Sequence, residues 1–206
     1  GIAKGVVRTR VGYTGGKGLD PSYHHIQDHT ESIQIEFDED KTSLEELLDL
    51  FWEAHNPYMH GWGRQYKCAV WFLNEEQKKI AKASKNEKER KSGQKIKTEI
   101  LMMTTWTNAE DYHQEYYLRS FSASHGNIFR LLSLKTEKQI RESEIAVQLN
   151  GYCTGKGTLE SFQMEVARWE NENMEGWREL PIEHKDKIVH MIEDALRKRK
   201  KKFLCM

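Results

Sequence analysis

The chain has 206 residues, of which 37% are hydrophobic and 31% charged, and its 32 basic side chains balance its 32 acidic ones. This composition predicts a water-soluble globular domain of moderate size with an appendage, and the neutral charge gives no electrostatic reason to expect a nucleic-acid partner. No apolar run reaches the ~20 residues that cross a bilayer, so we expect no membrane span. Three widely separated cysteines are a poor disulfide framework and favour a reducing compartment, the cytoplasm or alternatively the mitochondrion.

The first half of the chain alternates between strand and helix patterns. The apolar and polar periodicities predict strands at 5–12, 32–38, 65–73 and 97–107, and helices at 43–56 and 74–93. Thr42-Ser43 and Asn74 are residues typical of helix N-caps, and Asn56-Pro57 is expected to end the first helix. This order of elements predicts an α+β sandwich, with helices on one face of a mixed or antiparallel sheet.

The second half reads as helical. We expect helices at 109–118, 135–148, 158–173 and 181–202, with a glycine-rich loop at 150–157. The basic run 197–202 is interpreted as a solvated helix end, which the helix dipole favours, and a nuclear or nucleic-acid signal is the alternative. The predicted division is a core at residues 1–133 and a helical extension with the cysteine loop at 134–206.

One short motif invites a functional interpretation. A tyrosine lies where a β-branched strand meets a turn made almost wholly of glycine, in the motif Val11-Gly12-Tyr13-Thr14-Gly15-Gly16. Glycine tolerates positive φ and lets another molecule approach the backbone closely. These six residues are compatible either with a hairpin beside a packed aromatic ring or with a phenol that donates a hydrogen bond into a pocket.

Further segments place this motif in a larger pattern. In order along the chain they are Gly12-Tyr13-Thr14-Gly15-Gly16, Pro21-Ser22-Tyr23, His29-Thr30-Glu31, the helical segment 47–57, Gln65-Tyr66, 109–116 and Asn150-Gly151-Tyr152-Cys153. Each is weak alone, but the ordered set closely resembles the peptide methionine sulfoxide reductase A family. The resemblance covers residues 5–117 well and residues 149–162 more loosely.

The resemblance implies a fold and an activity. The fold is a two-layer α+β sandwich with a ferredoxin-like core, a mixed sheet covered by helices on one face, and additional C-terminal helices. The activity is reduction of the S diastereomer of methionine sulfoxide, free or in oxidised proteins, through a cysteine sulfenic acid and a disulfide. No bound cofactor is implied; thioredoxin or another dithiol is the reductant, and we expect a monomer.

The resemblance also assigns roles to residues. Tyr13 and Tyr66 match the two tyrosines that bind the sulfoxide oxygen, although both are also compatible with buried aromatics. Cys153 matches a resolving cysteine, and glycines around it predict a mobile loop that would bring its thiol to a distant sulfenic acid. The alternatives are an incidental thiol at Cys153 and a resolving role for Cys205.

The chain departs from the family at the nucleophile. The family carries this cysteine in a Gly-Cys-Phe-Trp motif, and these 206 residues contain no such motif and no cysteine before Cys68. Cys68 follows a polar residue within a predicted strand, and we interpret it as a packed core thiol. We therefore expect the first strand and the nucleophile to lie outside this chain, the chain alone to be inactive, and a sheet edge to be exposed.

A second departure concerns the acid. The position of the family's catalytic glutamate falls on His25, and the loop after Pro57 lacks the family's aspartate. Because histidine titrates near neutrality, His25 is a candidate general acid, and Glu31 is either a second candidate or structural. The His24, His25 and His29 group offers nitrogen ligands without a complementary carboxylate or cysteine, so a metal site is not expected. The alternative function is an inactive homologue that binds methionine sulfoxide or a protein partner.

Overall fold

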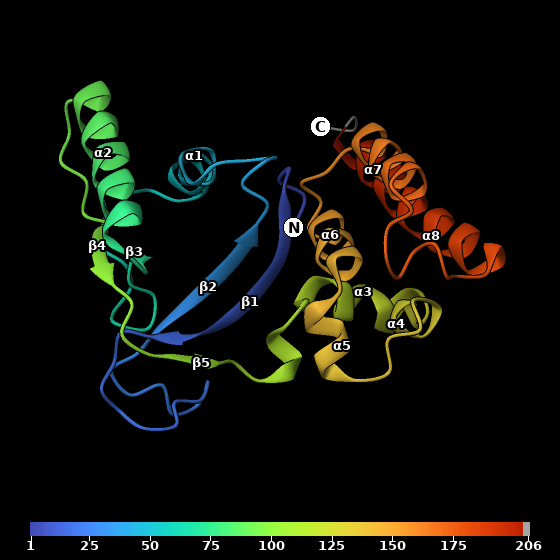
Figure 1. The fold of residues 1–206 in the computed structure, drawn as a ribbon, viewed down its shortest axis with the longest axis horizontal. Coiled ribbons are helices and arrows are strands. Elements are labelled where there is room, and N and C mark those ends of the chain that lie inside the picture. Colours follow the sequence, from blue (N-terminus) through green and yellow to red (C-terminus); the bar gives the residue numbers. More distant parts are fainter. Residues whose placement is uncertain (204–206) are drawn as a thin grey trace. The chain divides into compact units, whose positions relative to one another are not determined.

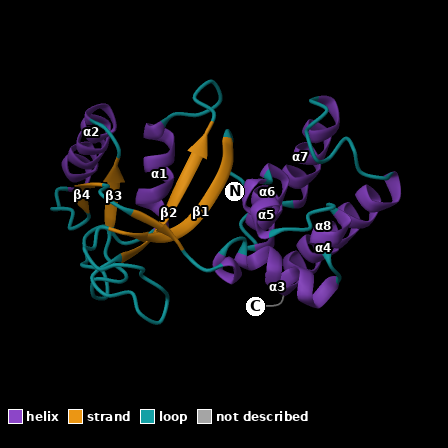
Figure 2. Ribbon diagram, turned by 60° about the horizontal axis from the view of Figure 1, so that its bottom comes forward, coloured by secondary structure: helices purple, strands orange, loops and turns teal. Residues whose placement is uncertain are grey.

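The computed structural model describes residues 1–203, and its contacts divide the chain into two compact units. We call Arg10–Glu110 the strand unit, and Gly1–Thr9 together with the chain from Asp111 onward the helical unit. The predicted boundary between residues 133 and 134 lies inside the helical unit. The helices Leu44–Ala54 and Glu75–Ser92 belong to the strand unit, and the other helices belong to the helical unit (Figure 2).

The strand unit confirms the α+β class but not the single mixed sheet. Its elements are β1 (Val6–Thr14, which starts in the helical unit), β2 (Thr30–Phe37), α1 (Leu44–Ala54), β3 (Ala69–Phe72), α2 (Glu75–Ser92), β4 (Glu99–Met102) and β5 (Trp106–Asn108) (Figure 1). They form a three-stranded sheet in the order β2-β1-β5 and a separate two-stranded sheet of β3 and β4. The prediction of one sheet was therefore wrong.

The predicted strand at 97–107 changes partner in its middle, and this change separates the sheets. Its first part, β4, runs parallel to β3 with Trp71 opposite Leu101. Its second part, β5, runs antiparallel to β1 with Tyr13 opposite Thr107. Neither a glycine nor a proline stands between the two parts, so the sequence alone did not reveal the break.

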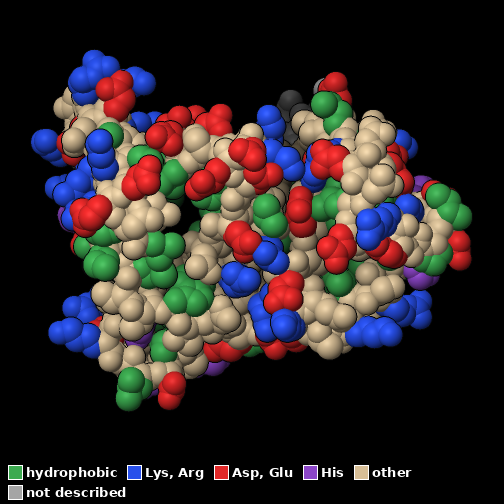
Figure 3. Space-filling view, in the orientation of Figure 1, with side chains coloured by type: hydrophobic (Ala, Val, Ile, Leu, Met, Phe, Trp, Pro, Cys, Tyr) green, Lys and Arg blue, Asp and Glu red, His purple; other side chains and the backbone are tan. Residues whose placement is uncertain are grey.

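Local signals fixed the helices of the strand unit as predicted. Ser43 caps α1 in a capping box with Glu46, and Asn74 caps α2 through the backbone of Gln77. The two helices share a small core of Leu48, Trp52, Ala81 and Ile96. Lysines and arginines along α2 alternate with glutamates, and both signs of charge are visible over this helix in Figure 3.

The glycine turn after β1 has a steric cause. Gly15 has φ of +79°, a left-handed conformation that side chains with a Cβ rarely adopt. A Cβ at this position would also overlap the ring of Trp71 from β3. The turn therefore requires glycine for the backbone to pass the indole.

The helical unit packs its helices around a continuous aromatic core. Its elements are the 3-10 turn η1 (Asp111–His113) and the helices α3 (Tyr116–His125), α4 (Ile128–Leu131), α5 (Glu137–Glu142), α6 (Glu144–Cys153), α7 (Leu159–Asn171) and α8 (Ile182–Phe203). Phe162, Trp169 and Trp177 are fully buried in this core. Thr158 caps α7 as its sequence predicts.

Three predictions within the helical unit needed correction. The predicted helix at 109–118 is interrupted because Glu115 has φ of +50°. The predicted helix at 135–148 breaks at Ser143, whose side chain caps α6. The predicted loop at 150–157 is helical up to Cys153, because Gly151 packs directly against Ile2 and this tertiary contact outweighs the low helix propensity of glycine.

Two findings concern the surface of the chain. Among the described residues, no helix combines the length and the apolar character needed to cross a bilayer. At the basic end of α8, Arg197 pairs with Glu193 and Lys198 with Asp194, which agrees with a solvated helix end there. The side chains of the rest of the run, and Cys205, lie outside the described part.

Candidate functional site

Glu110 connects the predicted tyrosine motif to the next loop. The hydroxyl of Tyr13 donates to Glu110 Oε2 at 2.7 Å, and the backbone N–H of Tyr23 donates to Glu110 Oε1 at 2.9 Å. Tyr13 is only 1% exposed. The end of β1 and the loop that follows it are thus held together by one carboxylate, and the hydroxyl proton of Tyr13 is directed at that carboxylate.

Tyr66 lies beside Glu31 and Tyr23 and is open to solvent. Its side chain is 50% exposed. The negative charge of Glu31 raises the pKa of the Tyr66 phenol, with smaller contributions from burial and from neighbouring Tyr23. At neutral pH this phenol is therefore protonated, and Tyr23 is its hydrogen-bond partner.

Glu31 is held in place by its neighbour in space. Gln65 Nε2 donates to Glu31 Oε1 at 2.6 Å, and the Glu31 N–H donates to the Gln65 carbonyl at 2.9 Å. These contacts join the start of β2 to the segment that carries Tyr66. The predicted tyrosines thus belong to one connected group, which we call the tyrosine cluster: Tyr13, Tyr23, Glu31, Gln65, Tyr66 and Glu110.

The three histidines do not converge. His29 is buried, and its Nε2 lies 2.9 Å from the Gly18 carbonyl. His24 and His25 are exposed, and the backbone of His25 forms a two-way bridge with Ser22. No set of three or more histidine, cysteine or acidic side chains is arranged to hold a metal ion within the described residues.

The loop that carries the histidines is anchored by Asp28. Its carboxylate accepts from the backbone N–H groups of Lys17 and Gly18, at 2.9–3.1 Å. These two hydrogen bonds, the one from Lys17 first, lower the pKa of Asp28. Arg64, from the loop before Tyr66, lies 3.8 Å from the same carboxylate. Both loops around the tyrosine cluster are therefore tied to one anionic side chain.

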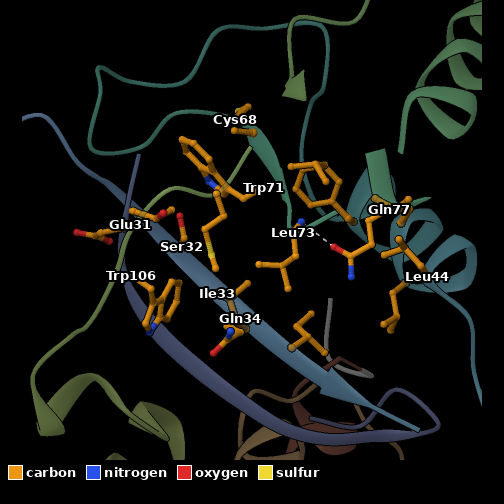
Figure 4. A pocket seen from close by; sticks show the side chains of 18 of the residues that line it. Glu31, Ser32, Ile33, Gln34, Leu44, Cys68, Trp71, Leu73, Gln77 and Trp106 are labelled. Atoms are coloured by element: carbon orange, nitrogen blue, oxygen red, sulfur yellow. Dashed lines mark hydrogen bonds between the residues drawn. The ribbon is translucent and has the colours of Figure 1, made fainter. Parts of the chain in front are cut away.

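An apolar groove of about 410 Å³ lies between the two sheets of the strand unit. Ile33 and Ile35 line it from β2, and Trp71 and Leu73 line it from β3 and the residue after it (Figure 4). β2 is the end strand of the three-stranded sheet, and β3 is one of the two strands of the other sheet, so both strands that line the groove are edge strands. Cys68 also lines the groove and is half-buried, so it is not the packed core thiol that we expected.

The comparison with known proteins identifies the family. The family model described as peptide methionine sulfoxide reductase matches residues 2–145. The chain belongs to the peptide methionine sulfoxide reductase family.

Relatives of this reductase family cover most of the chain. It is 40% identical to "Peptide methionine sulfoxide reductase" of Drosophila melanogaster over 81% of its own length and 66% of that protein. It is 32% identical to "Peptide methionine sulfoxide reductase A5" of Arabidopsis thaliana over 74% of its length and 61% of that protein. The chain thus spans less than two thirds of the length of these curated relatives.

A solved reductase structure has the same fold over part of the chain. Reduced Mxr1 from Saccharomyces cerevisiae matches with a TM-score of 0.53 and 28% identity, over 56% of this chain and 72% of that one. The same yeast protein has also been solved in complex with Trx2, a structure that matches with a TM-score of 0.40 and 25% identity over 52% of this chain and 65% of that one.

Cys153, the predicted resolving cysteine, belongs to the helical unit. It is buried at the last residue of α6, so its sulfur is not carried on the mobile loop that we expected. A helix C-terminus carries partial negative charge, which does not favour a thiolate there. Reaction of this thiol would require the last turn of α6 to open.

Sequence reasoning missed the role of Glu110. The residue stands inside the motif 109–116, which we used only to recognise the family. Its two hydrogen bonds join residues 97 and 87 positions apart, so no local sequence pattern predicts them. The available signal was a carboxylate two residues after β5, the strand that pairs with the end of β1.

Proposed function

We propose that this protein reduces methionine sulfoxide, of the S diastereomer, to methionine in oxidised proteins or as the free amino acid. Membership of the family supports this proposal, and the observation that carries it is the half-exposed Tyr66 phenol held beside Glu31. A sulfoxide oxygen is a strong acceptor, and a protonated phenol aimed at it stabilises the charge that develops as the S–O bond breaks. Glu110 accepts hydrogen bonds from the Tyr13 hydroxyl and from the Tyr23 backbone, and so holds the loop that carries Tyr23 beside Tyr66.

The proposed reaction conserves oxygen and electrons. A cysteine thiolate attacks the sulfoxide sulfur, Tyr66 donates to the oxygen, and the oxygen passes to the cysteine as a sulfenic acid while methionine leaves. The sulfenic acid then condenses with a second thiol, for which we propose Cys153, to give a disulfide and water. His25 is exposed on the anchored loop and is the proposed proton donor in place of the family's glutamate.

We propose that neither Cys68 nor Cys153 is the attacking thiol, and that these 206 residues alone do not turn over. The Gly-Cys-Phe-Trp motif that the resemblance implies is not among them. The groove between β2 and β3 supports the same view. β2 and β3 are end strands of their sheets and both line this groove, so each presents an edge on which a further strand can pair.

For the reductant we propose thioredoxin or another dithiol, with no bound cofactor. The yeast relative Mxr1 was solved in complex with Trx2, which supports a partner of this class. A protein of this kind would act as a monomer in the cytoplasm or the mitochondrion, on oxidised proteins.

A second candidate function is a homologue that binds methionine sulfoxide or a protein partner without catalysis. One observation favours it: His25 stands where the family has a glutamate, and the loop 58–64 contains no carboxylate. Binding would then depend on the tyrosine cluster in the same way, and no product would form.

A reductase assay tests the proposal. It compares the complete gene product with the 206-residue chain on each separated diastereomer of N-acetylmethionine sulfoxide, with thioredoxin as the reductant. We expect the complete product to reduce the S form only, and the chain alone to bind it without turnover. Tyr66→Phe should lower kcat/KM by about 100-fold, since one donor to the oxygen is lost.

Tyr58→Phe is the matched control, because this ring packs against the core of α1 and α2. It should leave kcat/KM unchanged. No reduction of either diastereomer by the complete product would refute the enzyme, and binding that depends on Tyr66 would then favour the second candidate.

A further inference from the structure

Trp62 is an exposed indole next to the tyrosine cluster. It is 87% exposed. Its backbone forms an antiparallel bridge with that of Tyr66, the phenol that we place at the sulfoxide oxygen. Opposed residues in such a bridge have Cα atoms about 4.5–5.5 Å apart, so the two aromatic residues leave neighbouring points of the chain.

The backbone around Trp62 is fixed. A Cβ at Gly61 would overlap the carbonyl of Tyr66, so the two strands of the bridge approach as closely as glycine allows. The Gly63 N–H donates to the Gly61 carbonyl at 3.0 Å, and Thr30 Oγ1 donates to the Arg64 carbonyl at 2.9 Å. These contacts hold the turn that carries Trp62 against the Tyr66 segment, with the indole in water.

Other exposed apolar side chains stand on the same two loops. We define the apolar rim as Leu19, Tyr23, Met59 and Trp62, all of them exposed. Leu19 and Tyr23 lie on the loop that Asp28 anchors, and Tyr23 contacts Tyr66. Exposed apolar side chains on loops positioned by a scaffold are typical of a binding surface, and Tyr23 connects its loop to the candidate site through its contact with Tyr66.

We propose that Trp62 is a specificity residue that contacts apolar side chains flanking an oxidised methionine in an extended polypeptide. The proposal rests on the function proposed above and names its substrate class. An extended chain advances about 3.3 Å per residue, so with the sulfoxide at Tyr66 the next one or two residues reach Trp62. Oxidation of a core methionine makes its side chain polar and disrupts packing, which exposes a segment whose flanking residues are apolar.

Binding of three ligands to the full chain, measured by isothermal titration calorimetry, tests this inference. They are N-acetylmethionine sulfoxide methylamide, a capped pentapeptide with the sulfoxide between leucine and phenylalanine, and the same peptide with glycine flanks. Trp62→Ala should raise the Kd of the apolar-flanked peptide about 10-fold, the loss of about 1.4 kcal/mol of contact, and change the other two by less than about 2-fold. Trp62→Phe should restore most of the affinity.

Met102→Ala is the matched control, since Met102 is an exposed apolar residue of β4 in the same unit. It should change none of the three constants. An equal loss for all ligands, or no loss for the apolar-flanked peptide, would overturn the specificity role, and dependence of Kd on protein concentration would assign the rim to self-association instead.

The same titrations separate this inference from the proposed function. If the apolar-flanked peptide binds equally well with methionine and with its sulfoxide, and still loses affinity in Trp62→Ala, sulfoxide recognition fails while the role of Trp62 in peptide binding stands. If the sulfoxide is preferred but Trp62→Ala changes nothing, the inference fails and the function stands.

Discussion

The two units of this chain bury their apolar residues to different extents. The helical unit closes around fully buried aromatic rings, among them Phe162, Trp169 and Trp177. The strand unit has a small core between α1 and α2, an open apolar groove, and large exposed side chains such as Ile33 and Trp62. Stability of the described chain should therefore reside mainly in the helical unit, and capacity to bind other chains in the strand unit.

The largest expected effect tests where stability resides. The ring of Trp169 meets that of Phe162 edge-on and that of Trp177 at a tilt, with centroids 6.2 and 4.8 Å away, and its Nε1 donates to Gln148 Oε1 at 2.6 Å. Trp169→Ala should lower the free energy of unfolding by about 3–5 kcal/mol, through lost burial and the cavity left behind. Urea unfolding followed by circular dichroism measures this change.

Ile33→Ala is the counterpart in the strand unit. Its side chain is half-exposed at the open groove, so its loss should cost less than about 0.5 kcal/mol. A cost as large as that of Trp169→Ala would mean that the groove is closed in solution, and the contrast between the units would disappear.

The same contrast explains what the sequence could predict. Helix starts at Ser43, Asn74 and Thr158 were predictable because a cap is a contact within four residues. The helical state of Cys153 was not, because it depends on the packing of Gly151 against Ile2, almost 150 positions away. The glycines around Cys153 indicated a loop, but the tertiary contact with Ile2 stabilises a helix there.

The candidate site divides in the same way. Ordered motifs identified the family and placed Tyr13 and Tyr66 in one unit with the residues that join them. The joining carboxylate of Glu110 was not predictable, because its partners are distant in sequence. The separation of the sheets also escaped prediction, since the segment 97–107 changes partner without a glycine or proline to mark the break.

The next largest effect concerns a buried acid in the helical unit. Glu115 is 5% exposed, and its Oε2 has no hydrogen-bond partner among the described residues. Burial raises its pKa from 4.5 to about 7, although Arg119 and a hydrogen bond from Thr9 partly oppose the shift. The native state then holds a proton that the unfolded state releases between these two pH values.

The contribution of Glu115 to the free energy of unfolding should therefore be highest below pH 4.5. It should fall by on the order of 3 kcal/mol as the pH rises to about 7. Glu115→Gln should remove this slope, because the amide does not titrate. Urea midpoints at a series of pH values measure it, with Glu142→Gln, an exposed residue of α5, as the control. An unchanged slope in Glu115→Gln would assign the pH dependence to another group.

The smallest effect concerns Glu31, a half-buried acid of the strand unit. Glu31 acts on Tyr66 by its charge, so Glu31→Gln should lower the pKa of the Tyr66 phenol toward its ordinary value of 10. The variant amide oxygen still accepts from Gln65, which keeps the local geometry. The ultraviolet absorbance of the phenolate, taken as the difference from the Tyr66→Phe protein, follows this titration, and Glu45→Gln is the control.

Salt should distinguish the two carboxyl groups. At about 1 M salt the Debye length is about 3 Å, so the influence of Glu31 on the solvent-exposed Tyr66 should largely vanish. The pKa of Glu115 should stay raised under the same conditions, because burial and not a neighbouring charge is its main cause. If salt leaves the Tyr66 titration unchanged, that phenol is shielded from solvent in the working protein, and the tyrosine cluster is as enclosed as the core of the helical unit.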